Sequence, residues 1–344
     1  MSEPRTTRLN PPYSLAVLGA GSWGTALAIL ASRNGHRTLL WGHDAEHVRR
    51  LVADRYNARY LPGHRFPESL VVTDDLASAV RSADAVLIAV PSQAFASLVV
   101  QIAPYLPMQA GLAWATKGLE APEGRLLHEV AEDIVSGERA LAVLSGPTFA
   151  AEVAAGLPTA ITIASRQCAF ANCLAARLHN EVFRAYTCDD MVGVQLGGAT
   201  KNVLAIAAGV ADGMRFGANS RAALITRGLA ELMRLGLALG GKPETMTGLS
   251  GLGDLVLTAT DDQSRNRRFG IGLGRGRTAE AMIAEIGQEI EGIVATRLIY
   301  EIARRREIDM PITEQVYRIL YEGLPANEAV RNLLLRTPKA EAPV

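Results

Sequence analysis

The order of hydrophobic and polar residues divides this chain into two parts. Down to about residue 188, short apolar runs alternate with segments in which apolar residues recur at helical spacing. Short apolar strands that alternate with helices are typical of a parallel sheet covered on both faces. Strands are predicted at residues 14–18, 38–41, 71–72, 85–90, 112–115, 141–144, 161–164 and 183–187, and helices at 25–35, 45–54, 74–84, 93–102 and 126–135, with one more helix between the last two strands. The polar stretch 55–69, which contains proline and glycine, is predicted to be a loop.

Beyond residue 188 only the helical spacing remains. Helices are predicted at 222–239, 254–260, 278–286, 295–306, 314–322 and 327–335, with prolines between several of them. We therefore expect an α/β domain with a doubly wound (Rossmann-type), mostly parallel sheet at residues 13–189, followed by an all-helical substrate domain at 190–337. The polar ends, residues 1–12 and 338–344, are predicted to be a disordered arm and a tail.

A long apolar segment, residues 191–214, joins the two parts and is predicted to be one buried helix. It contains Gly193, Gly197 and Gly198, each of which costs a helix about 1 kcal/mol relative to alanine. Such a cost is expected where another backbone must approach closely. The segment also contains a cation, Lys201, and no other charged residue follows it before Asp212.

Lys201 has two interpretations. It could stand at the edge of the helix, with its stem packed and its ammonium in water. A lysine taken out of water is costly unless it is paired or loses its proton. Because an apolar run of more than two turns follows Lys201, we favour a buried lysine with a chemical role. Lys201 is therefore the leading catalytic candidate.

The composition excludes several classes of protein. Basic and acidic residues number 35 each, which gives no electrostatic reason to expect a nucleic acid or an acidic membrane as partner. No apolar run approaches the ~20 residues that span a bilayer, so no transmembrane segment is predicted. Cys168, Cys173 and Cys188 fit no metal spacing and indicate a cytoplasmic protein with reduced thiols. The six histidines show no ligand spacing either, so no metal site is expected.

A glycine-rich turn follows the first strand. Gly19, Gly21 and Gly24 have the spacing GxGxxG, which by itself is weak evidence because an ordinary strand–helix turn can also contain glycines. Here the motif directly follows a strand and opens a helix, which favours a dinucleotide site. Gly19 would make the tight turn, Gly21 would let the pyrophosphate approach the backbone, and Gly24 would let the helix pack on the strand. The helix N-terminus would offer N–H groups to the phosphates.

Polar residues also follow two later strands. Lys117 comes after the strand at 112–115, and Gly146 and Thr148 come after the strand at 141–144. A surface lysine and a Gly-Pro turn would explain them one by one. Because ligands of parallel sheets bind at the carboxyl ends of the strands, the three together favour a site.

The helical half contains a second group of polar residues. Residues 247–254 (TGLSGLGD) form a glycine-rich entry to a helix, and Ser264, Arg265 and Asn266 follow. Exposed backbone N–H groups and the donors of Arg and Asn suit phosphate oxygens. The alternatives are a solvated basic face at 264–268 and an N-cap role for Asp254. The glycines before Asp254 favour a role that faces a ligand.

With these residues in hand, the chain closely resembles the NAD-dependent glycerol-3-phosphate dehydrogenase family, in its bacterial [NAD(P)+] form. The matching stretches are GAGSWGTALA, LWGHD, WATKGLE, SGPTFA, GVQLGGATKN, ALITRGLAE, GLGDLVLT and QSRNRRFG, and the resemblance extends from about residue 14 to residue 335. It implies reversible reduction of dihydroxyacetone phosphate to sn-glycerol 3-phosphate with NAD(H) or NADP(H), which supplies phospholipid synthesis. We expect a homodimer in the cytoplasm.

The resemblance also implies roles for individual residues. Lys201 would be the catalytic acid and base, with Asp254 and Lys117 beside it. The substrate would be bound by Lys117, Gly146, Thr148, Lys201, Asn202, Asp254, Thr258, Ser264, Arg265 and Asn266. The cofactor would be bound by the three glycines of the turn and by Ser22, Trp23, His43, Lys117, Ala150, Arg265, Glu289 and Glu291.

In this reaction the cofactor would deliver hydride to the ketone carbon, and Lys201 would donate a proton to the developing alkoxide. Asn202, Thr258 and Asp254 would orient Lys201 or the substrate. Burial and Lys117 should lower the pKa of Lys201, and Asp254 should oppose that shift. The sequence leaves the balance open.

The residues after the second strand bear on the choice of cofactor. Enzymes strict for NAD usually place an acidic residue at the end of this strand, on the ribose 2′-hydroxyl. Here the strand end is apolar, and His43 is the first polar residue. Asp44 follows as a rival, with an alternative role as an N-cap. We therefore expect NADP(H) to be used at least as well as NAD(H); the further candidate cations are Arg33, Arg49 and Arg50.

Two other functions remain open at this point. One is a related two-domain dehydrogenase that acts on another hydroxy acid or sugar acid. The cluster QSRNRR argues against it, because a phosphate needs these donors and a carboxylate alone does not. The other is a dinucleotide sensor without enzymatic activity, against which Lys201, Lys117 and Asp254 argue.

Overall fold

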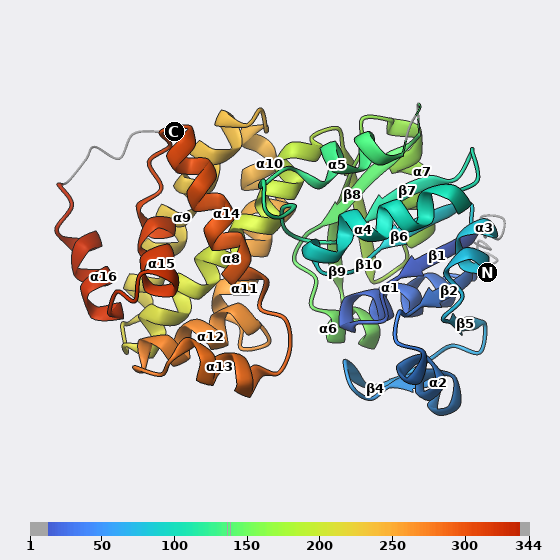
Figure 1. Cartoon of the computed structure of the whole chain (residues 1–344), viewed down its shortest axis with the longest axis horizontal. Helices are drawn as coiled ribbons and strands as arrows, with labels where there is room; N and C mark the ends of the chain where they lie inside the picture. Colours follow the sequence, from blue (N-terminus) through green and yellow to red (C-terminus); the bar gives the residue numbers. More distant parts are fainter. Residues whose placement is uncertain (1–12, 136, 138, 338–344) are drawn as a thin grey trace, which may run out of the picture.

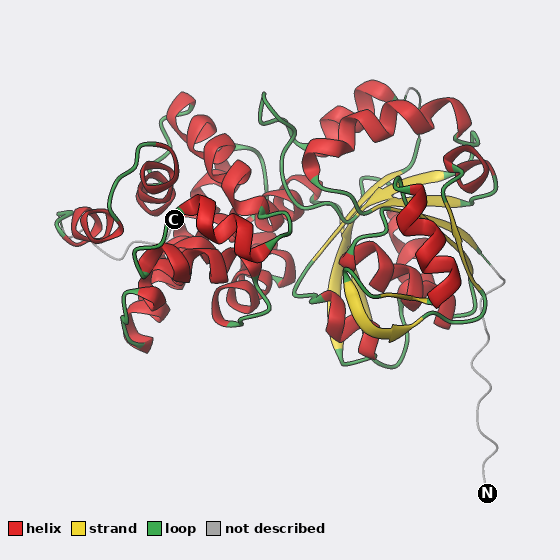
Figure 2. Ribbon diagram, turned by 60° about the horizontal axis from the view of Figure 1, so that its bottom comes forward, coloured by secondary structure: helices red, strands yellow, loops and turns green. Residues whose placement is uncertain are grey.

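The protein has two lobes, one built on a sheet and one built of helices (Figures 1 and 2). The computed structural model describes residues 13–135, 137 and 139–337. The predicted arm at 1–12 and the predicted tail at 338–344 lie outside these residues. All strands of the described chain precede residue 189, and the helical lobe follows, as the pattern of apolar residues predicts.

The sheet has eight strands in the order β10-β9-β8-β7-β6-β1-β2-β5. All neighbouring strands are parallel except β8 and β9, so the predicted doubly wound, mostly parallel sheet is confirmed. Its strands are β1 (Ser14–Leu18), β2 (Arg37–Trp41), β5 (Leu70–Thr73), β6 (Ala85–Ile88), β7 (Gly111–Trp114), β8 (Leu141–Ser145), β9 (Thr159–Ala164) and β10 (Phe183–Cys188).

Helices cover both faces of the sheet because side chains alternate between the faces along each strand. In β1, Leu15 and Val17 join one core, and Ala16 and Leu18 join the other. The first core includes α1 (Ser22–Arg33), α6 (Ala150–Ala155) and α7 (Cys168–Leu178). The second includes α3 (Leu76–Arg81), α4 (Ser92–Ile102) and α5 (Leu127–Ile134). A short 3₁₀ turn, η1 (Ala103–Tyr105), follows α4.

The predicted loop at 55–69 contains a small hairpin, which corrects the prediction. After α2 (Ala45–Asp54), β3 (Tyr56–Asn57) pairs with β4 (Leu61–Arg65) in an antiparallel ladder. These strands are too short and too polar for an alternating pattern. Burial of Leu61 and Phe66 against the first core holds the hairpin in place.

The central helix α8 (Met191–Gly213) is confirmed as one helix, and every residue in it except Val192 and Asp212 is buried. Other helices surround it (Figure 1). A Cβ atom at Gly197 would overlap the carbonyl oxygen of Ser250, and one at Gly198 would lie 2.9 Å from Oγ of Ser145. These glycines therefore allow the close approach that their cost in helix stability predicts.

The rest of the helical lobe is as predicted except for two short segments and one longer helix. Its elements are α9 (Ala218–Ala238), α10 (Pro243–Thr247), a π-helical turn η2 (Leu249–Gly253), α11 (Asp254–Thr260), α12 (Arg265–Gly274), α13 (Ala279–Ile286), α14 (Glu291–Arg305), α15 (Pro311–Tyr321) and α16 (Ala326–Leu334). The pattern of apolar residues does not predict α10, η2 or α12. The sequence of α12 does not indicate a helix, because it contains glycines at positions 270, 272 and 274 and glycine has a low helix propensity.

Among the helices of the described chain, none is both long and apolar enough to cross a membrane.

Candidate active site

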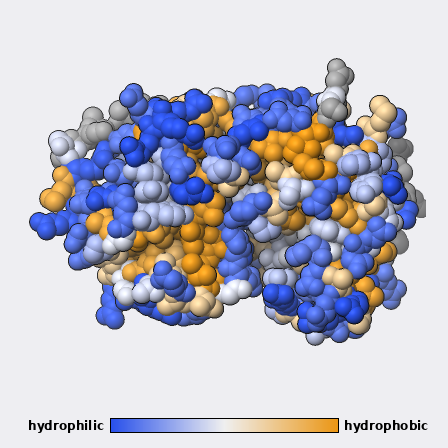
Figure 3. Space-filling model, viewed as in Figure 1, coloured by the Kyte–Doolittle hydropathy of each residue, from blue (hydrophilic) through white to orange (hydrophobic). Residues whose placement is uncertain are grey.

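A cavity of about 840 Å³ lies between the two lobes. One wall consists of the turns at the carboxyl ends of the parallel strands, and the other consists of α8, α11, α12 and the segment 287–291. Figure 3 shows the furrow between the lobes on one face, with hydrophilic residues along much of it. The volume is in the range of about 300–1,000 Å³ that is usual for small-molecule sites.

The glycine turn has the geometry that its motif predicts. Gly19 has a φ of +122°, and a Cβ atom there would lie 2.5 Å from the carbonyl oxygen of Ala89. A Cβ atom at Gly24 would overlap the carbonyl oxygen of Gly19. Gly21 borders the cavity, and nothing lies within 4 Å of where its Cβ would be. Because no side chain caps α1, its first N–H groups are available to an anion, which fits the pyrophosphate of a dinucleotide.

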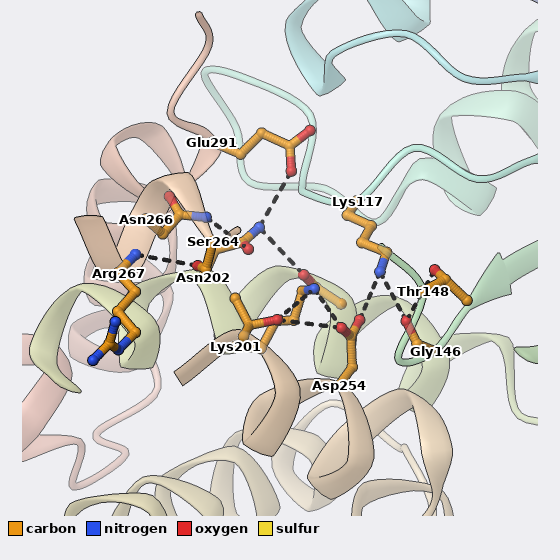
Figure 4. A network of polar contacts seen from close by, with 12 residues as sticks. Lys117, Gly146, Thr148, Lys201, Asn202, Asp254, Ser264, Asn266, Arg267 and Glu291 are labelled. Atoms are coloured by element: carbon orange, nitrogen blue, oxygen red, sulfur yellow. Dashed lines mark hydrogen bonds and ion pairs between the residues drawn. The ribbon is translucent and has the colours of Figure 1, made fainter. Parts of the chain in front are cut away.

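Two lysines from the two lobes share one carboxylate (Figure 4). Lys201 on α8 donates to Oδ1 of Asp254 at 2.5 Å and to Oγ1 of Thr258 at 2.9 Å. Lys117, which follows β7, donates to Oδ2 of Asp254 at 2.6 Å and to the carbonyl oxygen of Gly146 at 3.1 Å. The carboxylate is 1% exposed, and the lysine side chains are 9% and 13% exposed. The arrangement holds two ammonium groups at the base of the cavity with a single negative charge between them.

Burial decides the protonation of Lys201. Desolvation is the largest effect on its pKa, and the positive charge of Lys117 acts in the same direction. Asp254 opposes both, and the result is a pKa lowered to about 8. The sequence leaves open which of these opposing effects is larger, and in the structure their sum lowers the pKa of Lys201. The lowered pKa lies in the range in which an acid–base catalyst works at ordinary pH.

Asp254 does not cap its helix, so the alternative N-cap interpretation is wrong. The residue before α11 is Gly253, and no side chain caps that end. Both carboxylate oxygens of Asp254 instead accept from the lysines. The glycine-rich entry TGLSGLGD folds into the π-helical turn that presents Asp254 to the sheet lobe.

A second chain of hydrogen bonds lies beside Lys201. Asn202 donates to Oε2 of Glu291 at 3.3 Å and accepts from Nδ2 of Asn266 at 2.9 Å. Oδ1 of Asn266 accepts from the N–H of Gly292 at 3.0 Å. Burial raises the pKa of Glu291, which favours its protonated form. The chain connects α8, α12 and α14 directly at the cavity.

The residues of the predicted basic cluster have different roles. Ser264 caps α12 by accepting from the N–H of Arg267 at 3.2 Å, and it also borders the cavity. Arg265 and Arg268 border the cavity, one helical turn apart. Arg267 is buried away from it between Asp212 and Asp262. The solvated-face interpretation therefore does not fit this cluster.

Most of the predicted site residues share this one cavity. Those that border it are Gly19, Gly21, Ser22, Trp23, His43, Lys117, Thr148, Ala150, Lys201, Asn202, Thr258, Ser264, Arg265, Asn266, Glu289 and Glu291. Gly24, Gly146 and Asp254 do not border it. Gly24 packs beneath the glycine turn, Gly146 accepts a hydrogen bond from Lys117, and Asp254 accepts from both Lys117 and Lys201.

Asp44 caps the N-terminus of α2, which was the alternative to its role as a ligand of the ribose. Its Oδ1 accepts from the N–H groups of Glu46 at 3.0 Å and of His47 at 3.1 Å. These hydrogen bonds lower the pKa of Asp44. Asp44 and His43 both border the cavity at the end of β2.

Comparison with known proteins gives the family. The model of the NAD-dependent glycerol-3-phosphate dehydrogenase N-terminus matches residues 14–171, and that of the C-terminus matches residues 190–331. This chain belongs to the NAD-dependent glycerol-3-phosphate dehydrogenase family.

Members of the family from several bacteria resemble the chain over nearly its whole length. A glycerol-3-phosphate dehydrogenase [NAD(P)+] from Methylococcus capsulatus is 64% identical over 330 residues, which are 96% of this chain and 98% of the relative. The enzyme of the same name from Colwellia psychrerythraea is 55% identical over 95% of this chain and 98% of its own length. The crystal structure of glycerol-3-phosphate dehydrogenase from Coxiella burnetii has a TM-score of 0.91 at 49% identity and covers 94% of this chain and 99% of that one. D-mandelate dehydrogenase, at 12% identity and a TM-score of 0.63, shares the fold alone.

Within this family fold, several residues that border the cavity were missed by the sequence analysis. They are Arg59 and Tyr60 in the unpredicted hairpin, Gln263 and Arg268 around α12, and Gln288 before α14. Arg265 donates to Gln288 at 3.5 Å, and Gln93 on α4 donates to Glu289, which borders the cavity, at 3.1 Å. Of the missed residues, Gln263 and Arg268 had a sequence signal that could have indicated them, since both lie within the motif QSRNRRFG. Among the described residues, no group of three or more His, Cys, Asp and Glu side chains could hold a metal ion.

Proposed function

We propose that this protein catalyses the reversible reduction of dihydroxyacetone phosphate to sn-glycerol 3-phosphate with NADPH or NADH. The names of its relatives support this reaction, since they are glycerol-3-phosphate dehydrogenases [NAD(P)+] at 51–64% identity over nearly the full length. The observation that carries the proposal is the buried Lys201 at the base of a cavity that also contains the glycine turn. A dinucleotide and a small phosphorylated substrate would share this space.

The bound cofactor would supply the hydride that reduces the ketone carbon. Lys201 would donate a proton to the ketone oxygen, so that hydride and proton together give the alcohol. In the oxidative direction, neutral Lys201 would accept the hydroxyl proton. The pKa of about 8 supports both directions, because both forms of the lysine are populated near neutral pH.

We assign Asp254 the role of a positioning residue. Its two oxygens hold Lys201 and Lys117 at 2.5 and 2.6 Å, and Thr258 holds Lys201 from another side. This pairing fixes both ammonium groups where the carbonyl oxygen and the substrate phosphate would lie. Preorganised donors of this kind stabilise charge that develops in the transition state.

The phosphate of the substrate would be bound at the helical wall. Arg265 and the amide of Asn266 stand in the first turn of α12, where the helix dipole also favours an anion. Lys117 and Thr148 would approach from the sheet lobe. The donors outnumber the acidic groups that face them, which suits a phosphate better than a lone carboxylate.

The activity test follows NADPH absorbance after dihydroxyacetone phosphate is added to the purified protein. We expect steady oxidation of NADPH and formation of sn-glycerol 3-phosphate. Dihydroxyacetone without the phosphate should be a very poor substrate, because each lost charge-assisted hydrogen bond costs about 1.5–3 kcal/mol. Comparable turnover of both substrates, or faster turnover of a 2-keto acid, would favour the alternative hydroxy-acid dehydrogenase. No turnover with any of them would favour the dinucleotide sensor.

We also propose that residues 13–189 and 190–337 form the two functional domains, and that the protein acts in the cytoplasm as a homodimer. The three free thiols support a reducing compartment. Large apolar side chains exposed on the helical lobe, among them Leu237, Leu334 and Leu335, support a covered interface. Light scattering after size-exclusion chromatography tests the dimer, and a monomeric mass would contradict it.

A further inference from the structure

The hairpin β3–β4 is fixed to the dinucleotide turn. The side chain of Asn57 is fully buried and donates to the carbonyl oxygen of Ala20 at 3.0 Å and to Oγ1 of Thr25 at 2.9 Å. Its own Oδ1 accepts from the N–H of Tyr60 at 3.1 Å. The tip of the hairpin therefore cannot move independently of the glycine turn. In Figure 1, β4 and α2 lie side by side at the lower edge of the sheet lobe.

Arg59 stands at this tip with its charge unpaired. It borders the cavity, and no hydrogen bond or ion pair joins it to any residue that the structure describes. Its guanidinium lies 4.9 Å from the centre of the Tyr60 ring, which in turn meets the ring of His47 edge to face at 5.3 Å. A cation held over an aromatic face is oriented without losing its outward N–H donors.

Arg59 lies at the adenosine end of the site. His47 belongs to the first turn of α2, which begins directly after His43 and Asp44 at the end of β2. In folds of this kind the end of the second strand faces the ribose of the adenosine. His43, Asp44, His47, Arg59 and Tyr60 all border the cavity, so they enclose this end from two elements.

The other basic residues considered for this position do not border the cavity. Arg33 is the last residue of α1, at the end opposite the glycine turn, and donates to the carbonyl oxygen of Ala154 at 2.6 Å. Arg49 and Arg50 lie on exposed turns of α2. Arg59 is therefore the arginine placed to oppose a negative charge at this end of the cavity.

We propose that Arg59 binds the 2′-phosphate of NADPH and thereby gives the protein a preference for NADPH over NADH. The inference rests on the proposed function, since it names the form of cofactor that the same site takes. Arginine suits a phosphate because its planar fork donates two parallel hydrogen bonds. His43 faces the same space as a second donor. Asp44, whose Oδ1 already accepts two backbone N–H groups, opposes a phosphate less than a free carboxylate would.

Binding of adenosine fragments tests the proposal without turnover. Calorimetry with adenosine 2′,5′-bisphosphate and with 5′-AMP compares ligands that differ by the 2′-phosphate. In Arg59→Ala we expect the bisphosphate to bind about 10- to 100-fold more weakly, the range of one lost charge-assisted contact. Binding of 5′-AMP should change less than about threefold, because a neutral ribose offers the arginine no ionic partner.

In the activity assay, Arg59→Ala should change kcat/KM for NADPH and for NADH to different extents. For Arg59→Ala we expect kcat/KM to fall about 10- to 100-fold with NADPH and to stay nearly constant with NADH. Arg49→Ala is the matched control, since it removes an equal charge from the exposed side of α2 and should leave the ratio of the two cofactors unchanged. Activity with NADH reports that the variant is folded, and Arg59→Gln serves as a second variant that keeps side-chain volume.

Two results would overturn the proposal. If Arg59→Ala bound the bisphosphate and 5′-AMP more weakly by the same factor, Arg59 would contact the adenine or the ribose and not the 2′-phosphate. Unchanged binding of both would mean that Arg59 does not contact the cofactor. A failure of the proposed reaction can be told apart from a failure of this proposal. If the reaction were wrong, turnover of dihydroxyacetone phosphate would be absent with both cofactors, but Arg59→Ala would still weaken binding of the bisphosphate more than binding of 5′-AMP.

Discussion

At the scale of residues, the central feature of the site is one buried carboxylate that pairs with two lysines. Asp254 lies between Lys201 and Lys117, so one negative charge serves two ammonium groups in a space with little water. Charges there interact more strongly than they would in solution. Burial and the positive charge of Lys117 together outweigh the attraction of the shared carboxylate, so the pKa of Lys201 is lowered and its proton is easier to transfer.

Replacing Lys201 should remove most of the turnover and leave the fold intact. In Lys201→Met the side chain keeps its apolar stem within α8 but has no proton to donate. Loss of a general acid costs about 10²–10⁴-fold in rate, measured as kcat for dihydroxyacetone phosphate. Lys242→Met is the control, because Lys242 is exposed and pairs with Asp189 on the surface. A variant that kept more than about a third of wild-type turnover, with chemistry limiting the rate, would contradict the role of Lys201.

The pH dependence should have opposite signs in the two directions. Reduction needs protonated Lys201, so kcat/KM should fall as pH rises through about 8. Oxidation of sn-glycerol 3-phosphate needs the neutral amine, so its kcat/KM should rise with pH and level off above about 8. Initial rates between pH 6 and 10 measure both profiles. Profiles with the same sign would place the titrating group elsewhere.

At the scale of elements, the site depends on how closely α12 crosses α8. Gly209 and Gly213 of α8 face Gly270 and Gly274 of α12, and Cβ atoms at these positions would overlap backbone of the opposite helix. Small residues at a crossing let two backbones approach at the cost of helix propensity. The crossing places Asn202 within 2.9 Å of Asn266 and brings Arg265 to the cavity.

Gly270→Ala should therefore destabilise the protein, although alanine is the better helix former by about 1 kcal/mol. Its Cβ would overlap the carbonyl oxygen of Ile206, and such overpacking costs about 1–3 kcal/mol. Urea unfolding measures the change in the free energy of unfolding. Gly217→Ala is the control for the added methyl group, because nothing lies within 4 Å of its Cβ position; since Gly217 is the N-cap of α9, its loss should be limited to the cap contribution of less than about 1 kcal/mol. An unchanged or increased stability in Gly270→Ala would show that the crossing can relax.

At the scale of the whole molecule, the cofactor would bind at the boundary between the lobes. The cavity is bordered by the glycine turn, by the hairpin and by the helical wall. The hydrogen bond from Gln93 to Glu289 already connects the two lobes beside it. A ligand that contacts both lobes stabilises the folded molecule by mass action.

NADPH should raise the melting temperature of the wild type and should not raise that of Gly21→Val. At about 100 times Kd a ligand adds about 2.7 kcal/mol to the free energy of unfolding. Gly21 has open space around its Cβ position and a φ of −78°, so valine fits the fold but occupies the space where the pyrophosphate would lie. Thermal unfolding with and without NADPH measures the two shifts. Equal shifts in both proteins would place the cofactor elsewhere.

The sequence by itself determined the alternation of the main strands and helices down to residue 188, the change to an all-helical half and the buried central helix, although not the hairpin β3–β4 or the helices α6, α10 and α12. These follow from local periodicity, which each segment carries in its own residues. Most of the site residues that the sequence predicted do border the cavity, because the glycine turn, the strand ends and Lys201 stand in recognisable contexts. Its alternative for Asp44, an N-cap, was right, whereas the ligand-facing role of Asp254 stays a prediction: the carboxylate pairs with the two lysines and does not itself border the cavity.

Only the tertiary structure decided the features that depend on residues far apart in the chain. The helix α12 exists because its glycines pack on α8, although their local propensity argues against a helix. The pKa of Lys201 depends on a carboxylate 53 positions away and on a lysine from the other lobe. The hairpin that carries Arg59 is held by Asn57, whose hydrogen bonds span more than 30 residues. Propensity acts within a segment, whereas burial, charge and close backbone approach arise only when segments meet.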